Sequence, residues 1–272
     1  MKKERADKIL VERGLADTLP KAQAMIMAGL VSAGGRRVDK AGRPIDPESP
    51  LNVQKTLPYV GRGGLKLEQA LDELAVDPRG RVCADIGSST GGFTDCLLQR
   101  GAARVTCVDV DIRQLDERIR RHPLVVTLEK NARNLVPADL SEIPSLIVMD
   151  VSFISVLKIL PALRAIFASR APSPDDPAPL LLSLIKPQFE AAKGRVGRKG
   201  IIRDPEVHAE VLTRIAGEAA GLGFSLHGLI RCAVKGQKGN REFFARWAPG
   251  RMEPPGADVI RWVREAVRNE TD

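Results

Sequence analysis

Residues 85–93 read DIGSSTGGF and connect a short apolar strand to a helix through a glycine-rich turn. The strand, RVCADIG (81–87), is an apolar run typical of a buried β-strand, and residues 93–100 have a helical pattern. Open parallel sheets bind their ligands at the edge where such strands end. The sequence therefore predicts a ligand site at this turn.

Further short apolar runs follow, and helical segments separate them. The predicted strands cover residues 104–109, 124–127, 145–150 and 180–186. This alternation is typical of a mostly parallel sheet with helices on both faces. After a helix at 205–221, strands at 224–230 and 242–247 have no helix between them, which predicts an antiparallel pair. We expect an α/β fold with a doubly wound, Rossmann-like sheet and a terminal antiparallel hairpin, which resembles S-adenosylmethionine-dependent methyltransferases.

A small α+β unit precedes this sheet. Residues 6–14 and 20–29 are predicted helices that end in glycine, and Gly34-Gly35 predicts a tight hairpin turn. The predicted boundaries are 1–57 for this unit, 58–61 for a linker, 62–250 for the sheet domain and 251–272 for a helical tail. Residues 171–179 are a predicted surface linker. The tail could cover the sheet or touch a partner, and the oligomeric state is open.

The charge balance favours a polyanionic partner. Lysine and arginine outnumber aspartate and glutamate by 42 to 34, a net charge of +8 with an isoelectric point near 9.5. The first 57 residues hold eleven basic and seven acidic residues, which is half of that excess. Nucleic acid is the partner class that such a balance indicates, although basic enzymes without nucleic-acid partners are common.

Other classes are disfavoured by what the sequence lacks. No run of about 18 apolar residues predicts a membrane span, and no signal peptide follows the basic N-terminus. The four cysteines and three histidines lack the spacing of a metal site or a disulfide framework. We therefore expect a cytoplasmic protein with no metal and no membrane attachment.

The glycine-rich turn departs from the G-x-G-x-x-G pattern of dinucleotide-binding folds, because Gly87 is followed by Gly91 and Gly92. S-adenosylmethionine has no phosphate, so its loop needs room and hydrogen bonds. Asp109 ends the second strand and can accept hydrogen bonds from ribose hydroxyls, whereas Asp85 can face the methionine amino group. The predicted cofactor-binding residues are Asp85, Gly87, Ser88, Gly91, Gly92, Phe93 and Asp109.

Five motifs carry a resemblance to a known family. They are GRGGLKL (61–67), DIGSSTGGFTD (85–95), MDVSFIS (149–155), LIKPQFE (184–190) and GNREFF (239–244). In order and spacing they resemble the TlyA family of ribosomal RNA 2′-O-methyltransferases, some members of which are labelled haemolysins. The resemblance covers all but the stretch from about residue 249 onwards. Gly61 stands where the family commonly has Ser, and Ser88 where it commonly has Ala.

The first unit resembles the S4-like RNA-binding domain. The matching residues are ERGL (12–15), IMAGLV (26–31), RRVDKAGRPI (36–45) and LNV (51–53). In that family the second helix and the following hairpin form a basic surface against structured RNA. The resemblance implies ribosomal RNA or a ribosomal subunit as partner, contacted by Lys21, Arg36, Arg37 and Lys40. Leu19-Pro20-Lys21 stands where the family often has Ser-Arg, which predicts one weaker phosphate contact.

A ribose 2′-hydroxyl is a weak acid, so its methylation requires help in removing the proton. The resemblance implies a Lys-Asp-Lys-Glu tetrad formed by Lys66, Asp150, Lys186 and Glu242. Lys186 would accept the proton or orient the hydroxyl, and Lys66 would stabilise developing alkoxide charge. The two carboxylates would hold the lysines, and a crowded positive site would make a lysine lose its proton more readily.

Other chemistries fit these residues less well. Methylation of an exocyclic nitrogen would want an Asn/Asp-Pro-Pro-aromatic segment where MDVSF (149–153) stands, and carbon methylation would want a cysteine there. An rRNA-binding assembly factor without activity and a membrane-active toxin are the alternative functions. Phe153 and either Phe243 or Phe244 are candidates for stacking on a base, although such aromatic residues more often belong to a core.

Overall fold

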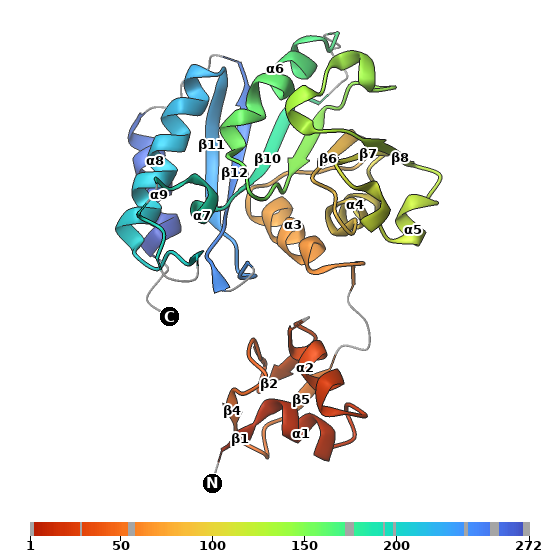
Figure 1. The fold of residues 1–272 in the computed structure, drawn as a ribbon, viewed down its shortest axis with the longest axis vertical. Helices are drawn as coiled ribbons and strands as arrows, with labels where there is room; N and C mark the ends of the chain where they lie inside the picture. The colour runs from red at the N-terminus through yellow and green to blue at the C-terminus, as the bar shows by residue number, and fades with distance from the viewer. Residues whose placement is uncertain are drawn as a thin grey trace. The chain divides into compact units, whose positions relative to one another are not determined.

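The computed structural model describes residues 3–27, 29–53, 58–171, 177–192, 194–197, 200–236, 239–250 and 256–268. The chain divides into two compact units, Met1–Arg62 and Gly63–Asp272 (Figure 1). Part of the predicted linker 171–179 lies outside the described residues.

The described residues of the N-terminal unit form two helices and two small antiparallel sheets. The helices are α1 (Ala6–Glu12) and α2 (Leu19–Met27). One sheet pairs β1 (Glu4–Arg5) with β4 (Pro44–Ile45), and the other has the order β3 (Arg36–Arg37), β2 (Val31–Ala33), β5 (Leu51–Val53). Apolar side chains of both helices form its core, including Ile9, Leu10 and Ile26.

Glycine turns set the path of this unit. Gly34 and Gly35 both have positive φ, 55° and 76°, which is the backbone of the two-residue hairpin turn between β2 and β3. Gly29, with φ 77°, follows α2, and a side chain there would overlap the Arg37 guanidinium. The turn therefore brings Arg37 of the hairpin against the end of α2.

The C-terminal unit is built on a seven-stranded sheet with the order β11-β12-β10-β9-β6-β7-β8 (Figure 1). The strands are β6 (Val82–Ile86), β7 (Arg104–Asp109), β8 (Val125–Glu129), β9 (Leu146–Met149), β10 (Leu180–Ile185), β11 (Phe224–Arg231) and β12 (Phe243–Pro249). β12 runs antiparallel to both of its neighbours, β10 and β11, while β6 to β10 pair in parallel. The predicted α/β class and the terminal antiparallel pair are confirmed.

Helices cover both faces of this sheet. They are α3 (Arg62–Glu73), α4 (Gly92–Gln99), α5 (Glu117–Arg120), α6 (Leu160–Ala168), α7 (Pro187–Glu190), α8 (Pro205–Gly221) and α9 (Gly256–Arg268), with short 3-10 turns at 112–114, 132–134, 137–139 and 156–158. α6, α8 and α9 share one core cluster with alternate strand residues such as Ile147 and Met149. The ring of Phe93 in α4 packs on Phe244, whose sequence neighbours belong to that cluster, so α4 lies on the opposite face.

The predicted C-terminal tail contains a helix that covers the sheet, which is one of the two roles its sequence left open. α9 packs on α8 and β11, and its Val263 and Ala266 are buried in the core cluster. Residues 256–268 therefore cover the sheet. Across the described ranges, no helix combines the length and apolarity needed to cross a bilayer.

Candidate active site

The first pair of the predicted tetrad joins α3 to the start of β12. Nζ of Lys66 lies 2.5 Å from Oε2 of Glu242, across 176 positions of sequence. Both side chains are buried, and Lys66 shares the buried face of α3 with Leu67 and Ala70. A buried ion pair is costly unless both charges are satisfied, so this pair points to a role beyond stability.

The second pair lies where β9 and β10 end. Nζ of Lys186 is 2.5 Å from Oδ1 of Asp150 and donates a hydrogen bond of 2.8 Å to Oγ of Ser152. β9 and β10 are parallel neighbours, so residues that follow their carboxyl ends meet at one edge of the sheet. The structure thus brings the four tetrad residues together as two lysine-carboxylate pairs.

The two nearby carboxylates decide the protonation state of Lys66. Burial by itself lowers the pKa of the Lys66 ammonium, but the charges of Glu242 and Asp150 outweigh burial and raise the pKa. A Lys66 that keeps its proton is what its expected task, stabilising developing alkoxide charge, requires. At neutral pH this group is a cation that can donate hydrogen bonds.

Two glycines of the turn after β6 are required by close packing. Gly87 has φ 83°, and a Cβ there would lie 2.5 Å from the Asp150 carbonyl oxygen. Gly91 has φ 91°, and a Cβ would lie 2.9 Å from Leu115. Any other residue at these positions would be strained and would push the turn away from its neighbours.

Polar atoms without partners lie beside this turn. Asp85 is fully buried, and its Oδ2 accepts hydrogen bonds from Thr94 N at 3.0 Å and Thr94 Oγ1 at 2.7 Å. Oδ1 of Asp85 and Oγ of Ser88 are buried without a hydrogen-bond partner among the described residues. Buried polar atoms are costly when unsatisfied, so both are free to bind a ligand or an ordered water.

Asp109 at the end of β7 lies on a cavity of about 660 Å³. Its Oδ2 accepts from Ser89 N at 2.8 Å and its Oδ1 from Asp111 N at 3.1 Å, which fixes the carboxylate in the loop. Gly87 and Asp150 line the same cavity. A cavity of this size, at the carboxyl ends of parallel strands, suits a cofactor.

Several residues that line the cavity were missed by the sequence analysis. They are Ser89, Gln114, Lys130, Asn131, Arg133, Ser152 and Lys158. Lys130 and Asn131 directly follow β8, so the rule that ligands bind beyond the ends of parallel strands could have found them. Ser152 follows Asp150 by two positions, but no local pattern indicates its contact with Lys186.

The three phenylalanines that were candidates for stacking on a base differ in exposure. Phe243 and Phe244 are fully buried and belong to the core. Phe153 is 88% exposed, with a φ of 64° that is rare for such a residue, and its ring centroid lies 4.9 Å from that of Phe189. Phe93, proposed for cofactor binding, packs its side chain on Phe244.

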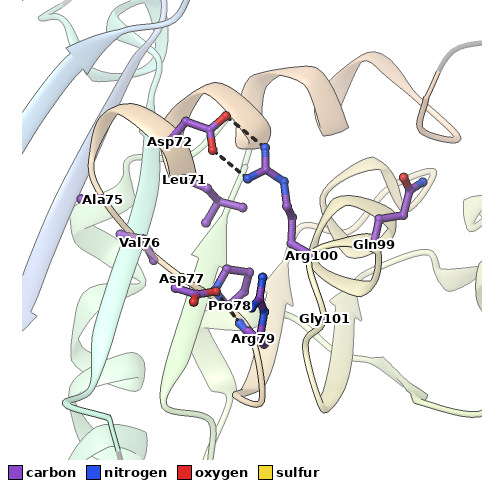
Figure 2. A pocket seen from close by; sticks show the side chains of 10 residues that line it. All are labelled: Leu71, Asp72, Ala75, Val76, Asp77, Pro78, Arg79, Gln99, Arg100 and Gly101. Atoms are coloured by element: carbon purple, nitrogen blue, oxygen red, sulfur yellow. Dashed lines mark hydrogen bonds and ion pairs between the residues drawn. The ribbon is translucent and has the colours of Figure 1, made fainter.

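A second cavity, of about 510 Å³, is lined by residues that precede β6 and β7, at the ends of these strands opposite the tetrad. Figure 2 shows the side chains that line it. Its lining comes from the end of α3, the segment before β6 and the end of α4. Figure 2 shows the Arg100 guanidinium facing the Asp72 carboxylate, at 2.7 and 3.0 Å. No predicted site residue lies there. Within the described ranges, no cluster of His, Cys, Asp or Glu is arranged to hold a metal ion.

The predicted RNA-contacting residues of the N-terminal unit are all exposed. Arg36 and Arg37 form β3, and Lys40 follows them in the next loop. Lys21 forms an ion pair with Asp17 on the surface, so part of its charge is compensated. Arg36 and Lys40 form no ion pair with a described residue, so they are the stronger candidates for phosphate contacts.

Comparison with known proteins agrees with this geometry. Residues 59–247 match the FtsJ-like methyltransferase model, and residues 4–50 match the S4 domain. The chain is 46% identical to the candidate rRNA methyltransferase YqxC of Bacillus subtilis, over 97% of this chain and 94% of that protein. It is 39% identical to the 16S/23S rRNA (cytidine-2′-O)-methyltransferase TlyA of Mycobacterium tuberculosis, over 89% of each chain. A solved structure of a candidate hemolysin from Streptococcus thermophilus is 38% identical, with a TM-score of 0.74 over 99% of this chain and 96% of that one.

The fold, the lysine-carboxylate pairs at the sheet edge and the family match over residues 59–247 agree, and the chain belongs to the FtsJ-like methyltransferase family.

Proposed function

We propose that this protein transfers a methyl group from S-adenosylmethionine to a ribose 2′-hydroxyl of ribosomal RNA, in the cytoplasm. The observation that carries this proposal is the pairing of Lys66 with Glu242, at the start of β12, and of Lys186 with Asp150, after β10 and β9, each at 2.5 Å. The names of the relatives, the S4 domain and the basic charge of the chain support RNA as the substrate.

The two lysines have different tasks in this mechanism. Lys186, held by Asp150 and Ser152, orients the 2′-hydroxyl for attack or, as a neutral amine, accepts its proton. Lys66 keeps its charge beside Glu242 and stabilises the developing alkoxide. Asp150 and Glu242 fix the positions of the two amines, so the geometry is set before the substrate binds.

The turn and cavity after β6 and β7 fit the proposed cofactor. When bound, S-adenosylmethionine supplies an electrophilic methyl group on a sulfonium. Asp109 has lone pairs left for the ribose hydroxyls, and the unpartnered Oδ1 of Asp85 suits a positively charged amino group, directly or through water. Gly87 keeps the backbone close to Asp150, which supports a cofactor pocket next to the tetrad.

Transfer of labelled methyl groups to rRNA tests this proposal. RNA from cells with and without the protein is mapped for 2′-O-methyl positions, and the purified protein is then given the unmodified RNA. We expect label at one or a few riboses. A protein that binds rRNA but transfers no methyl group would be an assembly factor without activity, and the proposal would then be wrong.

Phe153 is proposed as a platform for a base of the substrate. It is exposed beside Ser152 and backed by Phe189. Stacking of a base on an aromatic ring contributes about 1–3 kcal/mol, so Phe153→Ala should raise the KM for RNA about five- to 150-fold. Phe153→Trp is the matched control and should retain most binding. An unchanged KM in the alanine variant would remove the platform role.

Replacing Asp109 by alanine should weaken S-adenosylmethionine binding. Loss of two charge-assisted hydrogen bonds to a ribose costs about 1.5–3 kcal/mol, or about 10- to 150-fold in Kd. Calorimetry measures this change directly. Asp95→Ala is the matched control. It removes a carboxylate of α4 that does not line the cavity, so it should leave Kd unchanged. Equal affinities for the wild type and the Asp109 variant would refute the role.

Cofactor affinity should increase with pH because of Asp85. Burial raises the pKa of the Asp85 carboxyl to about 7, although the hydrogen bonds from Thr94 lower that pKa in part. A cationic amino group binds the ionised form better, so affinity should rise through pH 6 to 8, up to about tenfold per pH unit below the pKa. The raised pKa also means that this group makes the free protein less stable as pH rises from about 4 to 7.

Calorimetry at pH 6, 7 and 8 measures this pH dependence. The same series on Asp85→Asn subtracts any titration of the cofactor itself, and the variant should lose the protein-dependent part of the slope. If both proteins give the same slope, Asp85 does not take part in binding.

A further inference from the structure

We propose that two connections beside the tetrad form a second RNA-binding surface, separate from the N-terminal unit. Three of its described cations form no ion pair with a described residue: Arg203, Lys235 and Arg241, which we call the loop cations. This inference rests on the proposed function and adds where the catalytic unit itself holds the RNA backbone.

Both connections are attached to tetrad residues. The first leaves β10 at Lys186, passes through α7 and leads to α8; the second runs from β11 to Glu242 at the start of β12. β11 and β12 are antiparallel neighbours and β12 also pairs with β10, so both connections emerge at the edge of the sheet that holds the tetrad (Figure 1).

Asn240 joins the two connections into one surface. It is buried; its Oδ1 accepts from Ile202 N at 3.1 Å, and its Nδ2 donates to the Gly200 carbonyl at 2.9 Å. Within the second connection, Gly236 N donates to the Asn240 carbonyl at 3.0 Å. Arg203 follows Ile202 and Arg241 follows Asn240. Because Ile202 and Asn240 are hydrogen-bonded, the backbone segments that carry the two arginines lie next to each other.

Both connections have stretches that carry basic residues and no acidic ones. The described residues of 191–203 and 232–241 include four lysines and arginines and no acidic residue. Arg203 and Lys235 are exposed and Arg241 is half-buried, and none of the three forms an ion pair with any described residue. Arg195, by contrast, pairs with Glu210 at 2.6 Å.

A polyanion is the partner that suits this surface. The sulfonium cofactor is cationic and gains nothing from three uncompensated cations, whereas each RNA phosphate that meets one releases a bound counterion. Aromatic residues make up 4% of the chain, which favours recognition of the backbone over base stacking here.

Hydrogen bonds and close packing also connect this surface to α3 and to Glu242. Gln69, one turn after Lys66 in α3, donates to the Arg231 carbonyl at 3.0 Å and accepts from Ala233 N at 2.7 Å. A side chain at Gly236 would overlap the Glu242 carboxylate, so the backbone of the loop lies directly against that group. The connection that carries Lys235 and Arg241 is therefore attached both to the helix of Lys66 and to Glu242.

The test compares two variants of the full chain with equal loss of charge. One carries Arg203→Gln, Lys235→Gln and Arg241→Gln. The control carries Arg79→Gln, Arg264→Gln and Arg268→Gln, which removes three exposed arginines that lie outside both connections. Binding to transcribed 16S and 23S rRNA is measured over a salt series, with S-adenosylmethionine affinity and melting temperature alongside.

We expect the loop variant to flatten the slope of log affinity against log salt by about two units, since each contact contributes about 0.7 to 0.9. Its KM for RNA should rise while cofactor affinity and melting temperature stay unchanged, and the control should keep the wild-type slope. An unchanged slope in the loop variant, or equal flattening in the control, would overturn the inference. If the wild type transfers no methyl group but the slopes differ as expected, the proposed function fails and this RNA surface stands.

Discussion

Lys186→Ala is expected to reduce methyl transfer by about 10²–10⁴-fold while rRNA and cofactor affinities stay near their wild-type values. The reason is position: Lys186 contacts Asp150 and Ser152 at the sheet edge and does not line the cofactor cavity. Single-turnover transfer of labelled methyl, with both ligands saturating, isolates this step. Transfer within about tenfold of wild type, which is 1.4 kcal/mol of barrier, would remove Lys186 from the mechanism.

Lys186→Arg separates the two roles proposed for this residue. A guanidinium keeps the charge that pairs with Asp150 but does not release its proton at working pH. If Lys186 is the proton acceptor, the arginine variant should be as inactive as the alanine variant. If it only orients the hydroxyl, the arginine variant should regain a large part of the rate. Both outcomes are read from the same assay.

The second large effect is expected from the N-terminal unit. Replacing Arg36, Arg37 and Lys40 together by glutamine should flatten the salt dependence of rRNA binding by about two to three units. All three residues are exposed on β3 and the loop after it, where phosphates can reach them. Binding of the triple variant across a salt series, compared with wild type, gives the slope.

The competing view is that this unit only stabilises the protein. It predicts a lower melting temperature for the triple variant with an unchanged salt slope, so thermal unfolding is measured on the same samples. Lys21→Gln is a useful single comparison, because its ion pair with Asp17 should make its loss smaller than that of Arg36. An unchanged slope in the triple variant would end the RNA-anchor hypothesis.

Much of the fold could be predicted because its determinants are local. Strands such as Leu180–Ile185 are buried along their whole length, and an apolar run of that kind is readable without knowing its neighbours. The turn at Gly87 and Gly91 is readable too, because positive φ restricts the choice of residue. The position of β12 between β10 and β11 was not readable, since no local pattern records which strand pairs with which.

The candidate site also has some features that depend on local sequence and others that depend on tertiary structure. Sequence by itself determined the residue types at the strand ends, the glycine turn and the excess of positive charge, because each depends on a short segment or on composition alone. The tertiary structure alone decided that Lys66 is buried against Glu242, that Ser152 reaches Lys186 and that Phe153 is exposed while Phe243 and Phe244 are not. The physical reason is that burial and pairing are set by residues far away in the chain, such as the partner of Lys66 at 176 positions, whose approach no local propensity encodes.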